Sequence, residues 1–298
     1  MDIKRKPEWL KVRLPCNPDV KRVQGILSDH RLHSVCQEAR CPNMAECFHS
    51  GTATFLILGN VCTRKCLYCN VGHGIPLTVD ENEPERLVLA VKELKLNYIV
   101  ITSVTRDDLP DGGAEIFARC VDTLHRELSD CKVEVLIPDL MGNWQALEKI
   151  MKTNPSVVNH NIETVHNLFP VLRPQGNYRR SLELLHRIHQ YGEPVIKVKS
   201  GFMVGFGETW EDILKLLHDL ASIHCEQITV GQYLQPSVNH WPVVKYYEPD
   251  EFEVIRGMAY EMGLKRVESG PLVRSSYHAA KMADTISKSV KSFFYSAI

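Results

Sequence analysis

The sequence predicts an α/β fold: a partial (β/α)6 barrel of the TIM type, with an extension at each end. Short apolar segments of strand length alternate with amphipathic patterns of about 12 residues, which suit helices. Such alternation makes a parallel sheet with right-handed crossovers. Six strand–helix units fall short of the eight that close a TIM barrel. We therefore expect a barrel that is open at one side.

The six predicted strands are short runs of mainly β-branched and aliphatic residues, a composition that suits a buried parallel sheet. In chain order they are Phe55–Leu58, Tyr98–Ser103, Lys132–Ile137, Val157–Asn161, Val195–Ser200 and Gln227–Gly231.

The segments between these strands carry apolar residues at helical spacing. The predicted helices are Glu85–Lys95, Ala114–Leu128, Trp144–Lys152, Arg179–Gln190 and Thr209–His224, and a further helix at Asp250–Met262 follows the last strand.

Three segments are expected. Residues 1–52 are polar and interrupted by proline, with one helical pattern from Val20 to Leu32, and read as an N-terminal extension. Residues 53–248 hold the barrel. Residues 249–298 form a C-terminal extension that contains an Arg-Ser-Ser-Tyr motif at 274–277.

Composition excludes several classes of protein. With a net charge of −1, the chain has no basic field to attract nucleic acid, so no nucleic-acid partner is expected. No apolar run reaches the length that spans a bilayer, and the N-terminus resembles neither a secretory signal nor a transit peptide. We expect a cytoplasmic protein without a membrane partner. In that reducing compartment clustered cysteines are more often metal ligands than disulfides.

Six of the ten cysteines fall into two groups of three. The spacings are Cys36-x4-Cys41-x5-Cys47 and Cys62-x3-Cys66-x2-Cys69. An all-cysteine zinc or iron–sulfur site needs four ligands, so each group lacks one. One vacancy suits a small molecule, and a distant residue would fill the other. A zinc knuckle without its fourth ligand and three unrelated thiols are the competing interpretations of the second group.

The second group, placed after the first strand of an α/β chain, resembles the cluster loop of the radical S-adenosylmethionine (SAM) superfamily. Tyr68, just before Cys69, also fits that pattern. The resemblance implies a [4Fe–4S] cluster on Cys62, Cys66 and Cys69 whose open iron binds the amino and carboxylate groups of SAM. One-electron reduction then cleaves SAM to a deoxyadenosyl radical that removes hydrogen from unactivated carbon.

Further motifs narrow the resemblance to the lipoyl synthase family, from about Arg13 to His278. The cysteine run from Ser34 to Phe48 and the stretch from Gly51 to Gly59 are similar to that family. The other matching segments are 100–104, 106–114, 159–164, 178–181, 199–201, 231–236 and 270–278.

This resemblance implies an auxiliary [4Fe–4S] cluster on Cys36, Cys41 and Cys47, whose fourth ligand is a serine of the Arg-Ser-Ser-Tyr motif. That serine is Ser275 or Ser276, and we favour Ser276. An alkoxide is a harder ligand than a thiolate, so it should leave one iron easier to release. In the family the auxiliary cluster donates sulfur to C6 and C8 of a protein-bound octanoyl-lysyl group and is consumed.

The same resemblance implies the partners. The substrate would be an octanoylated lipoyl-carrier protein, either the glycine-cleavage H protein or a 2-oxoacid dehydrogenase lipoyl domain. A ferredoxin or flavodoxin would supply electrons. Another radical SAM sulfur-insertion enzyme and a non-catalytic zinc-stapled scaffold remain the alternatives.

Polar residues at the carboxyl ends of the strands are the remaining candidates, since chemistry gathers there in such folds. Glu163 is equally suited to a helix N-terminus, and Lys199 and Arg274 to the solvated surface. We expect Arg274 to stabilise the charge of a cluster as a catalytic residue. The predicted cofactor-binding residues are Tyr68, Thr102, Asn161, Glu163, Lys199 and Gln232.

Overall fold

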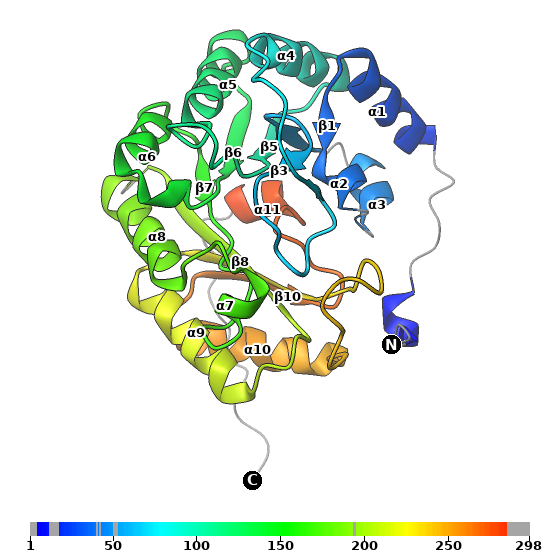
Figure 1. The fold of residues 1–298 in the computed structure, drawn as a ribbon, viewed down its shortest axis with the longest axis vertical. Helices are drawn as coiled ribbons and strands as arrows, with labels where there is room; N and C mark the ends of the chain where they lie inside the picture. Colours follow the sequence, from blue (N-terminus) through cyan, green and yellow to red (C-terminus); the bar gives the residue numbers. More distant parts are fainter. Residues whose placement is uncertain are drawn as a thin grey trace.

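The computed structural model describes residues 5–11, 18–39, 41, 43–49, 53–192 and 195–284. Among these residues the central element is one eight-stranded sheet in the order β1-β2-β5-β6-β7-β8-β9-β10 (Figure 1). The strands are β1 His33–Ser34, β2 Thr54–Ile57, β5 Tyr98–Ser103, β6 Lys132–Leu136, β7 Val157–Asn159, β8 Lys197–Val204, β9 Gln227–Gln232 and β10 Arg266–Gly270.

All neighbouring strands from β2 to β10 are parallel, and only β1 runs antiparallel to its neighbour β2. The sheet curves into a barrel (Figure 1). Among the described residues its two edge strands, β1 and β10, are not paired with each other, so the barrel is open. A separate pair, β3 Val61–Cys62 and β4 Gly72–His73, brackets the second cysteine group.

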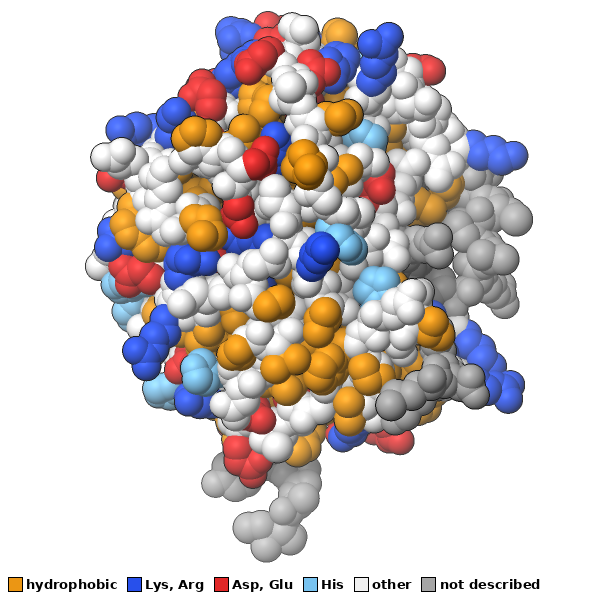
Figure 2. All heavy atoms as spheres, viewed as in Figure 1, with side chains coloured by type: hydrophobic (Ala, Val, Ile, Leu, Met, Phe, Trp, Pro, Cys, Tyr) orange, Lys and Arg blue, Asp and Glu red, His pale blue; other side chains and the backbone are white. Residues whose placement is uncertain are grey.

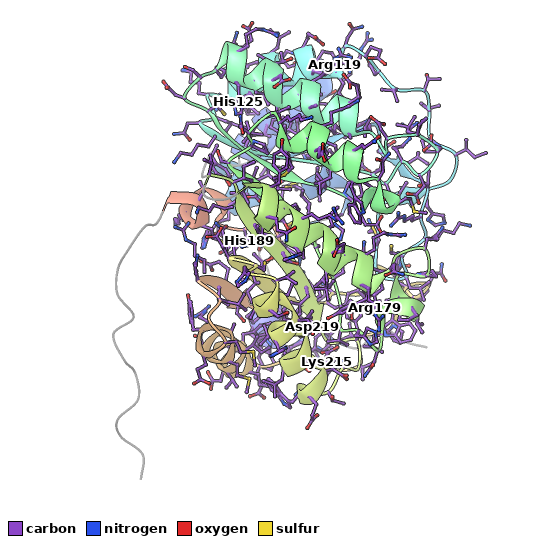
Figure 3. All side chains as sticks on the ribbon, turned by 90° about the vertical axis from the view of Figure 1, so that its left-hand side faces the viewer. Arg119, His125, Arg179, His189, Lys215 and Asp219 are labelled. Carbon is purple, nitrogen blue, oxygen red and sulfur yellow. The ribbon has the colours of Figure 1, made fainter. Side chains whose placement is uncertain are left out.

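Helices surround this sheet as an outer ring (Figures 1 and 3). Figure 3 shows Arg119 and His125 on the outward side of α5, Arg179 and His189 on that of α8, and Lys215 and Asp219 on that of α9. The helices are α1 Pro18–Asp29, α2 Val35–Glu38, α3 Met44–His49, α4 Glu83–Leu94, α5 Ala114–Glu127, α6 Trp144–Met151, α7 Phe169–Leu172, α8 Tyr178–Gly192, α9 Trp210–Ser222, α10 Pro249–Glu261 and α11 Ala279–Asp284; η1 Glu8–Leu10 and η2 Leu140–Gly142 are 3-10 turns.

The main core lies between the sheet and these helices, where Ile99, Val133 and Val198 are fully buried. The barrel interior is instead partly polar. Glu134 lies inside it with no exposed surface, accepting hydrogen bonds from Tyr98 Oη at 2.7 Å and Lys199 Nζ at 2.9 Å. α11 lies at the centre of the ring and packs Ala279 against β5 (Figure 1).

The predicted fold class is confirmed, and all six predicted strands are present. The sequence missed β10, since in Arg-Val-Glu-Ser-Gly only Val267 is a strongly apolar residue. It also ended the Val195–Ser200 strand too early: β8 runs through Gly201 to Val204. A Cβ at Gly201 would lie 2.5 Å from Thr229 Oγ1, so glycine is required where the strands pack this closely.

No helix of the described ranges is both long and apolar enough to cross a bilayer.

Candidate functional site

Three half-buried, free thiols lie in the loop that follows β2. Cys62 ends β3, and Cys66 and Cys69 follow in the turn beyond it. Burial raises the pKa of the Cys69 thiol to about 12, and the thiolates of Cys66 and Cys62 add to that rise, which places the three sulfurs in one electrostatic environment. A buried thiol that resists ionisation alone is a strong ligand once a metal stabilises its thiolate.

This cysteine loop is anchored by a buried arginine. Arg64, 3% exposed, donates from Nε to Asp107 Oδ2 at 2.6 Å and from Nη2 to Asp139 Oδ1 at 2.6 Å. Asp139 is fully buried and also accepts hydrogen bonds from Arg180 Nε at 3.0 Å and Nη2 at 2.8 Å. Residues that follow β2, β5 and β6 are thereby joined around the loop that carries Cys62 and Cys66.

Backbone contacts hold the far side of the same loop. Leu67 donates its N–H to Leu172 O at 3.0 Å, and Trp241 donates its N–H to Leu67 O at 2.9 Å. The His240 ring contacts Cys69 O through Nε2 at 3.0 Å. The loop is thus fixed from two sides before any ligand binds.

A cavity of about 480 Å³ opens at the carboxyl ends of the strands, beside the cysteine loop. Its volume suits a small molecule. The lining includes Cys62, Cys66, Tyr68, Cys69, Thr102, His160, Asn161, Glu163, Arg173, Arg274 and Ser275. Of the residues predicted to bind a cofactor, Tyr68, Thr102, Asn161 and Glu163 line this cavity.

Glu163 and Arg173 are two of the charged residues in the lining, which also contains Lys6 and Arg274. Burial raises the pKa of the Glu163 carboxyl, while Arg173 and a hydrogen bond from Asn161 Nδ2 at 3.1 Å oppose that rise. The Glu163 backbone has a φ of +71°, a left-handed conformation that is uncommon for this residue type and recurs at functional sites. Two buried polar atoms here, Asn161 Oδ1 and Arg173 Nε, have no partner within the described chain, which points to a ligand.

Sequence reasoning missed Arg173. It follows α7 instead of ending a strand, and its Nη1 donates to Asn161 O at 3.0 Å. Its guanidinium lies close enough to Cys66 to oppose the rise that burial causes in the pKa of that thiol. In the sequence Arg173 is an arginine before Pro174 with no motif around it, and its distance along the chain from the cysteines does not link it to them.

Two of the residues predicted to bind a cofactor, Lys199 and Gln232, lie outside the cavity lining. Lys199 lies inside the barrel with no exposed surface, ion-paired to Glu134 at 2.9 Å, because β8 continues past it to Val204. Gln232 donates from Nε2 to Tyr233 O at 3.1 Å and Lys245 O at 3.0 Å. Its Oε1 accepts a hydrogen bond from the N–H of Tyr247 at 2.9 Å, so both ends of the side-chain amide are hydrogen-bonded to backbone groups. Neither residue lines the cavity.

The first cysteine group gathers at the open edge of the barrel. Cys36 lies in α2, Cys47 in α3 and Cys41 between them, and β1 pairs with β2 just before α2. Burial raises the pKa of Cys36 to about 12, with a further contribution from the Cys41 thiolate. Burial likewise raises the pKa of Cys47 to about 12, and Cys36 and Cys41 raise it further. The three thiols therefore lie close enough together for each thiolate to disfavour ionisation of its neighbours.

The Arg-Ser-Ser-Tyr segment lies against this group. Asn43 Nδ2 donates to Leu272 O at 2.6 Å, and Tyr277 Oη donates to Glu46 Oε1 at 3.0 Å. The Arg274 guanidinium opposes the rise that burial causes in the pKa of Cys41. Two segments more than 220 positions apart are thus brought together.

Arg274 lies between the first cysteine group and the cavity. Burial lowers the pKa of its guanidinium, while Cys41 on one side and Glu163 on the other raise it. The adjacent serines differ in their contacts. Ser275 lines the cavity and accepts a hydrogen bond from Asn161 Nδ2 at 2.9 Å, whereas Ser276 is half-buried outside that lining.

The donor sets of both groups fit a cubane cluster. Within the described ranges, no three His, Cys, Asp or Glu side chains converge as ligands of one metal ion. Three cysteines on a cubane bind three different irons, so their sulfurs lie further apart than around one zinc ion. Each group supplies three thiols, which is the donor set of a cubane cluster with one iron left for another ligand.

Comparison with known proteins agrees with this geometry. Residues 56–220 match the radical SAM superfamily. The chain is 51% identical to lipoyl synthase of Roseiflexus sp. strain RS-1, over 92% of this chain and 91% of that protein. It is 50% identical to lipoyl synthase of Pseudoalteromonas translucida, over 94% and 87%. Methylornithine synthase has a similar fold, with a TM-score of 0.52 at 14% identity, over 84% of this chain and 81% of that one.

Proposed function

The chain belongs to the lipoyl synthase family of the radical SAM superfamily, and from this premise we propose how its residues divide the work. The enzyme inserts sulfur at C6 and C8 of a protein-bound octanoyl-lysyl group. Cys62, Cys66 and Cys69 hold one [4Fe–4S] cluster. That cluster, when bound, supplies the electron that cleaves SAM.

The cavity residues bind and orient SAM. Glu163 and Asn161 present a carboxylate and an unsatisfied amide oxygen, which suit the hydroxyl and amino donors of SAM. Arg173, with its free Nε, provides a cation for the SAM carboxylate in place of Lys199. Tyr68 and Thr102 complete the wall of the cavity.

Cys36, Cys41 and Cys47 hold the auxiliary cluster, and Ser276 is its fourth ligand. The observation that carries this assignment is the contact of the Arg-Ser-Ser-Tyr segment with the first cysteine group through Asn43 and Glu46. Ser275 is engaged by Asn161 on the cavity side, which leaves Ser276 as the serine available to the auxiliary site.

Arg274 holds positive charge between the two sites. Its guanidinium lines the cavity and interacts electrostatically with both Cys41 and Glu163. In this position it can stabilise the negative charge of a cluster and orient the acyl substrate between the two sites. We assign it as a catalytic residue on this geometry.

The partners follow from the reaction. The substrate is an octanoylated carrier protein, either a glycine-cleavage H protein or a 2-oxoacid dehydrogenase lipoyl domain, and a ferredoxin or flavodoxin supplies electrons. We place the enzyme in the cytoplasm, where clustered cysteines are more often metal ligands than disulfides. We propose residues 1–52, 53–248 and 249–298 as a division by role, with β1 and β10 of the two outer segments paired to the sheet of the barrel.

One experiment tests this function. Anaerobically reconstituted protein is incubated with an octanoyl-lysyl peptide, SAM and a reductant, and the peptide mass is measured. We expect two added sulfur atoms and formation of deoxyadenosine. If deoxyadenosine forms but the peptide mass is unchanged, the protein would be a radical SAM enzyme that acts on another acceptor. Zinc without iron in anaerobically purified protein would instead support a stapled scaffold.

A further inference from the structure

Building on the proposed function, we infer that the loops around the cavity mouth form the docking surface for the folded carrier domain that bears the octanoyl group. The surface consists of Leu67, Ile75, Leu77, Val171, Val238 and Val244, with Lys65 beside Leu67. We call it the mouth surface.

One side of the mouth surface is an apolar loop tip. Ile75 is 95% exposed and Leu77 is 83% exposed, the highest values among the large hydrophobic residues that the structure describes. Pro76 lies between them and restricts the backbone. The Gly74 N–H donates to Cys62 O at 3.0 Å, so the base of the tip is attached to the cysteine loop.

The other side joins three loops. Leu67, Val171, Val238 and Val244 are each 38% to 61% exposed. The backbone bonds of Leu67 to Leu172 and to Trp241 hold the cysteine loop, α7 and the loop after β9 together. Figure 2 shows hydrophobic side chains gathered below the centre of the face that Figure 1 views down the barrel.

Grouped exposure of this kind marks an interaction site, whereas single exposed apolar residues are ordinary. Leu89 on α4 and Val254 on α10 are exposed to a similar degree, at 53% and 47%, but lie on separate outer helices. The apolar side chains at the mouth come instead from different loops, and the loops of Leu67, Val171 and Val238 also contribute Tyr68, Arg173 and Pro236 to the cavity lining.

The charge at the mouth indicates an acidic partner. The carboxylates of Asp107 and Asp108 are already paired, with Arg64 and Arg106. Lys65 is exposed, and its ammonium has no ion pair within the described chain. A carrier with an acidic residue near its modified lysine would satisfy this charge and gain in association rate.

The size of the cavity explains why a separate docking surface is needed. About 480 Å³ accommodates SAM-sized and acyl groups, not a protein domain. An octanoyl-lysyl arm that reaches into the cavity therefore leaves its folded carrier against the rim. Apolar contact at that rim supplies affinity that the acyl chain alone lacks.

The test compares two substrates, the octanoylated carrier domain and a short octanoyl-lysyl peptide. The variants are Ile75→Ser/Leu77→Ser, Val238→Ser/Val244→Ser and Lys65→Gln, with Leu89→Ser/Val254→Ser as the matched control. We expect the first two to raise KM for the carrier about tenfold or more at nearly unchanged kcat. Their KM and kcat for the peptide should equal those of the wild type, and the control should match the wild type with both substrates.

Binding is measured separately by fluorescence anisotropy of a labelled octanoylated carrier, without reductant, so that no turnover occurs. The Lys65→Gln variant should lose much of the salt dependence of the wild-type Kd. A carrier KM within twofold of wild type in both apolar variants would overturn the docking surface. So would a shift in the oligomeric state of those variants by sedimentation, which would assign the surface to a second copy of this chain. If the wild type fails to convert even the peptide, the proposed function itself fails.

Discussion

The Arg64 anchor provides the sharpest test of how the cysteine loop is held. Replacing Arg64 by Met keeps an unbranched, apolar stem and removes the guanidinium. Asp139 then keeps only Arg180 as a charged partner, although it has no exposed surface, and Asp107 loses both of its bonds to Arg64. The substitution removes one cation from a network that joins the buried carboxylate of Asp139 to the more exposed carboxylate of Asp107.

The magnitude follows from that burial. Removing one partner of a buried, hydrogen-bonded pair costs about 3–5 kcal/mol, because the remaining charge is left poorly compensated. For a chain of this size 1 kcal/mol lowers the melting temperature by about 2–4 °C, so we expect a decrease on the order of 10 °C. The exposed pair of Lys149 and Glu115, whose side chains are 45% and 55% exposed, is the control. Lys149→Met should cost less than about 1 kcal/mol.

The assay is thermal and urea unfolding followed by circular dichroism, with a double-mutant cycle. Arg64→Met, Asp139→Asn and the double variant are compared with the wild type, and we expect a coupling energy of about 2 kcal/mol or more. Burial opposes ionisation of Asp139, but hydrogen bonds from Arg64 and Arg180 hold its pKa below the ordinary 3.8. Its contribution to stability is therefore present above about pH 4 and is lost as the pH falls further, more so in the wild type than in Arg64→Met. A coupling below 1 kcal/mol would refute the anchor.

Three further predictions concern single sites. Burial raises the pKa of Glu83 to about 7, so the contribution of its protonated carboxyl to stability is complete below pH 4.5 and is lost as the pH rises through 7. Glu83→Gln should therefore reduce the pH dependence of the free energy of unfolding, measured by urea titration from pH 4.5 to 8. Lys199→Met should destabilise the fold by about 3 kcal/mol by leaving Glu134 without its cation, with little change in SAM affinity by equilibrium dialysis. Cys66→Ala should abolish deoxyadenosine formation, whereas Cys41→Ala should stop sulfur insertion while some deoxyadenosine still forms; equal loss of both activities would contradict separate roles.

The barrel was predictable because its signals are local. Each strand from Phe55 to Gly231 is an apolar run bounded by turn residues, and burial on both faces of a parallel strand produces that pattern. The six clustered cysteines were predictable for the same reason, since their spacing lies within 34 residues. β10 was missed because a strand at the edge of the sheet needs fewer apolar residues.

The remaining site residues depend on contacts that no local pattern encodes. The sequence placed Lys199 at a strand end, but Gly201 lets β8 continue, so the side chain lies inside the barrel against Glu134. Arg173 reaches the cavity through the turn after α7, and its role is visible only from its unpartnered Nε. In both cases a tertiary contact, and not the residue type, decides whether a cation is structural or binds a ligand.

Under the roles proposed above, the two cysteine groups differ in how the chain completes them. Cys62, Cys66 and Cys69 lie in one loop that Arg64 fixes to the barrel. The ligands of this site are therefore close in the sequence, and its open position stays free for SAM in each turnover. The auxiliary site is closed by a segment more than 220 residues away, through hydrogen bonds at Asn43 and Glu46 that lie at the edge of the barrel. More than these bonds holds the segment, because it lies between β10, which is part of the sheet, and α11, whose Ala279 packs against β5. The proposed SAM site is thus completed within its own loop, whereas the proposed sulfur-donating site is completed by a distant segment that is itself anchored in the barrel.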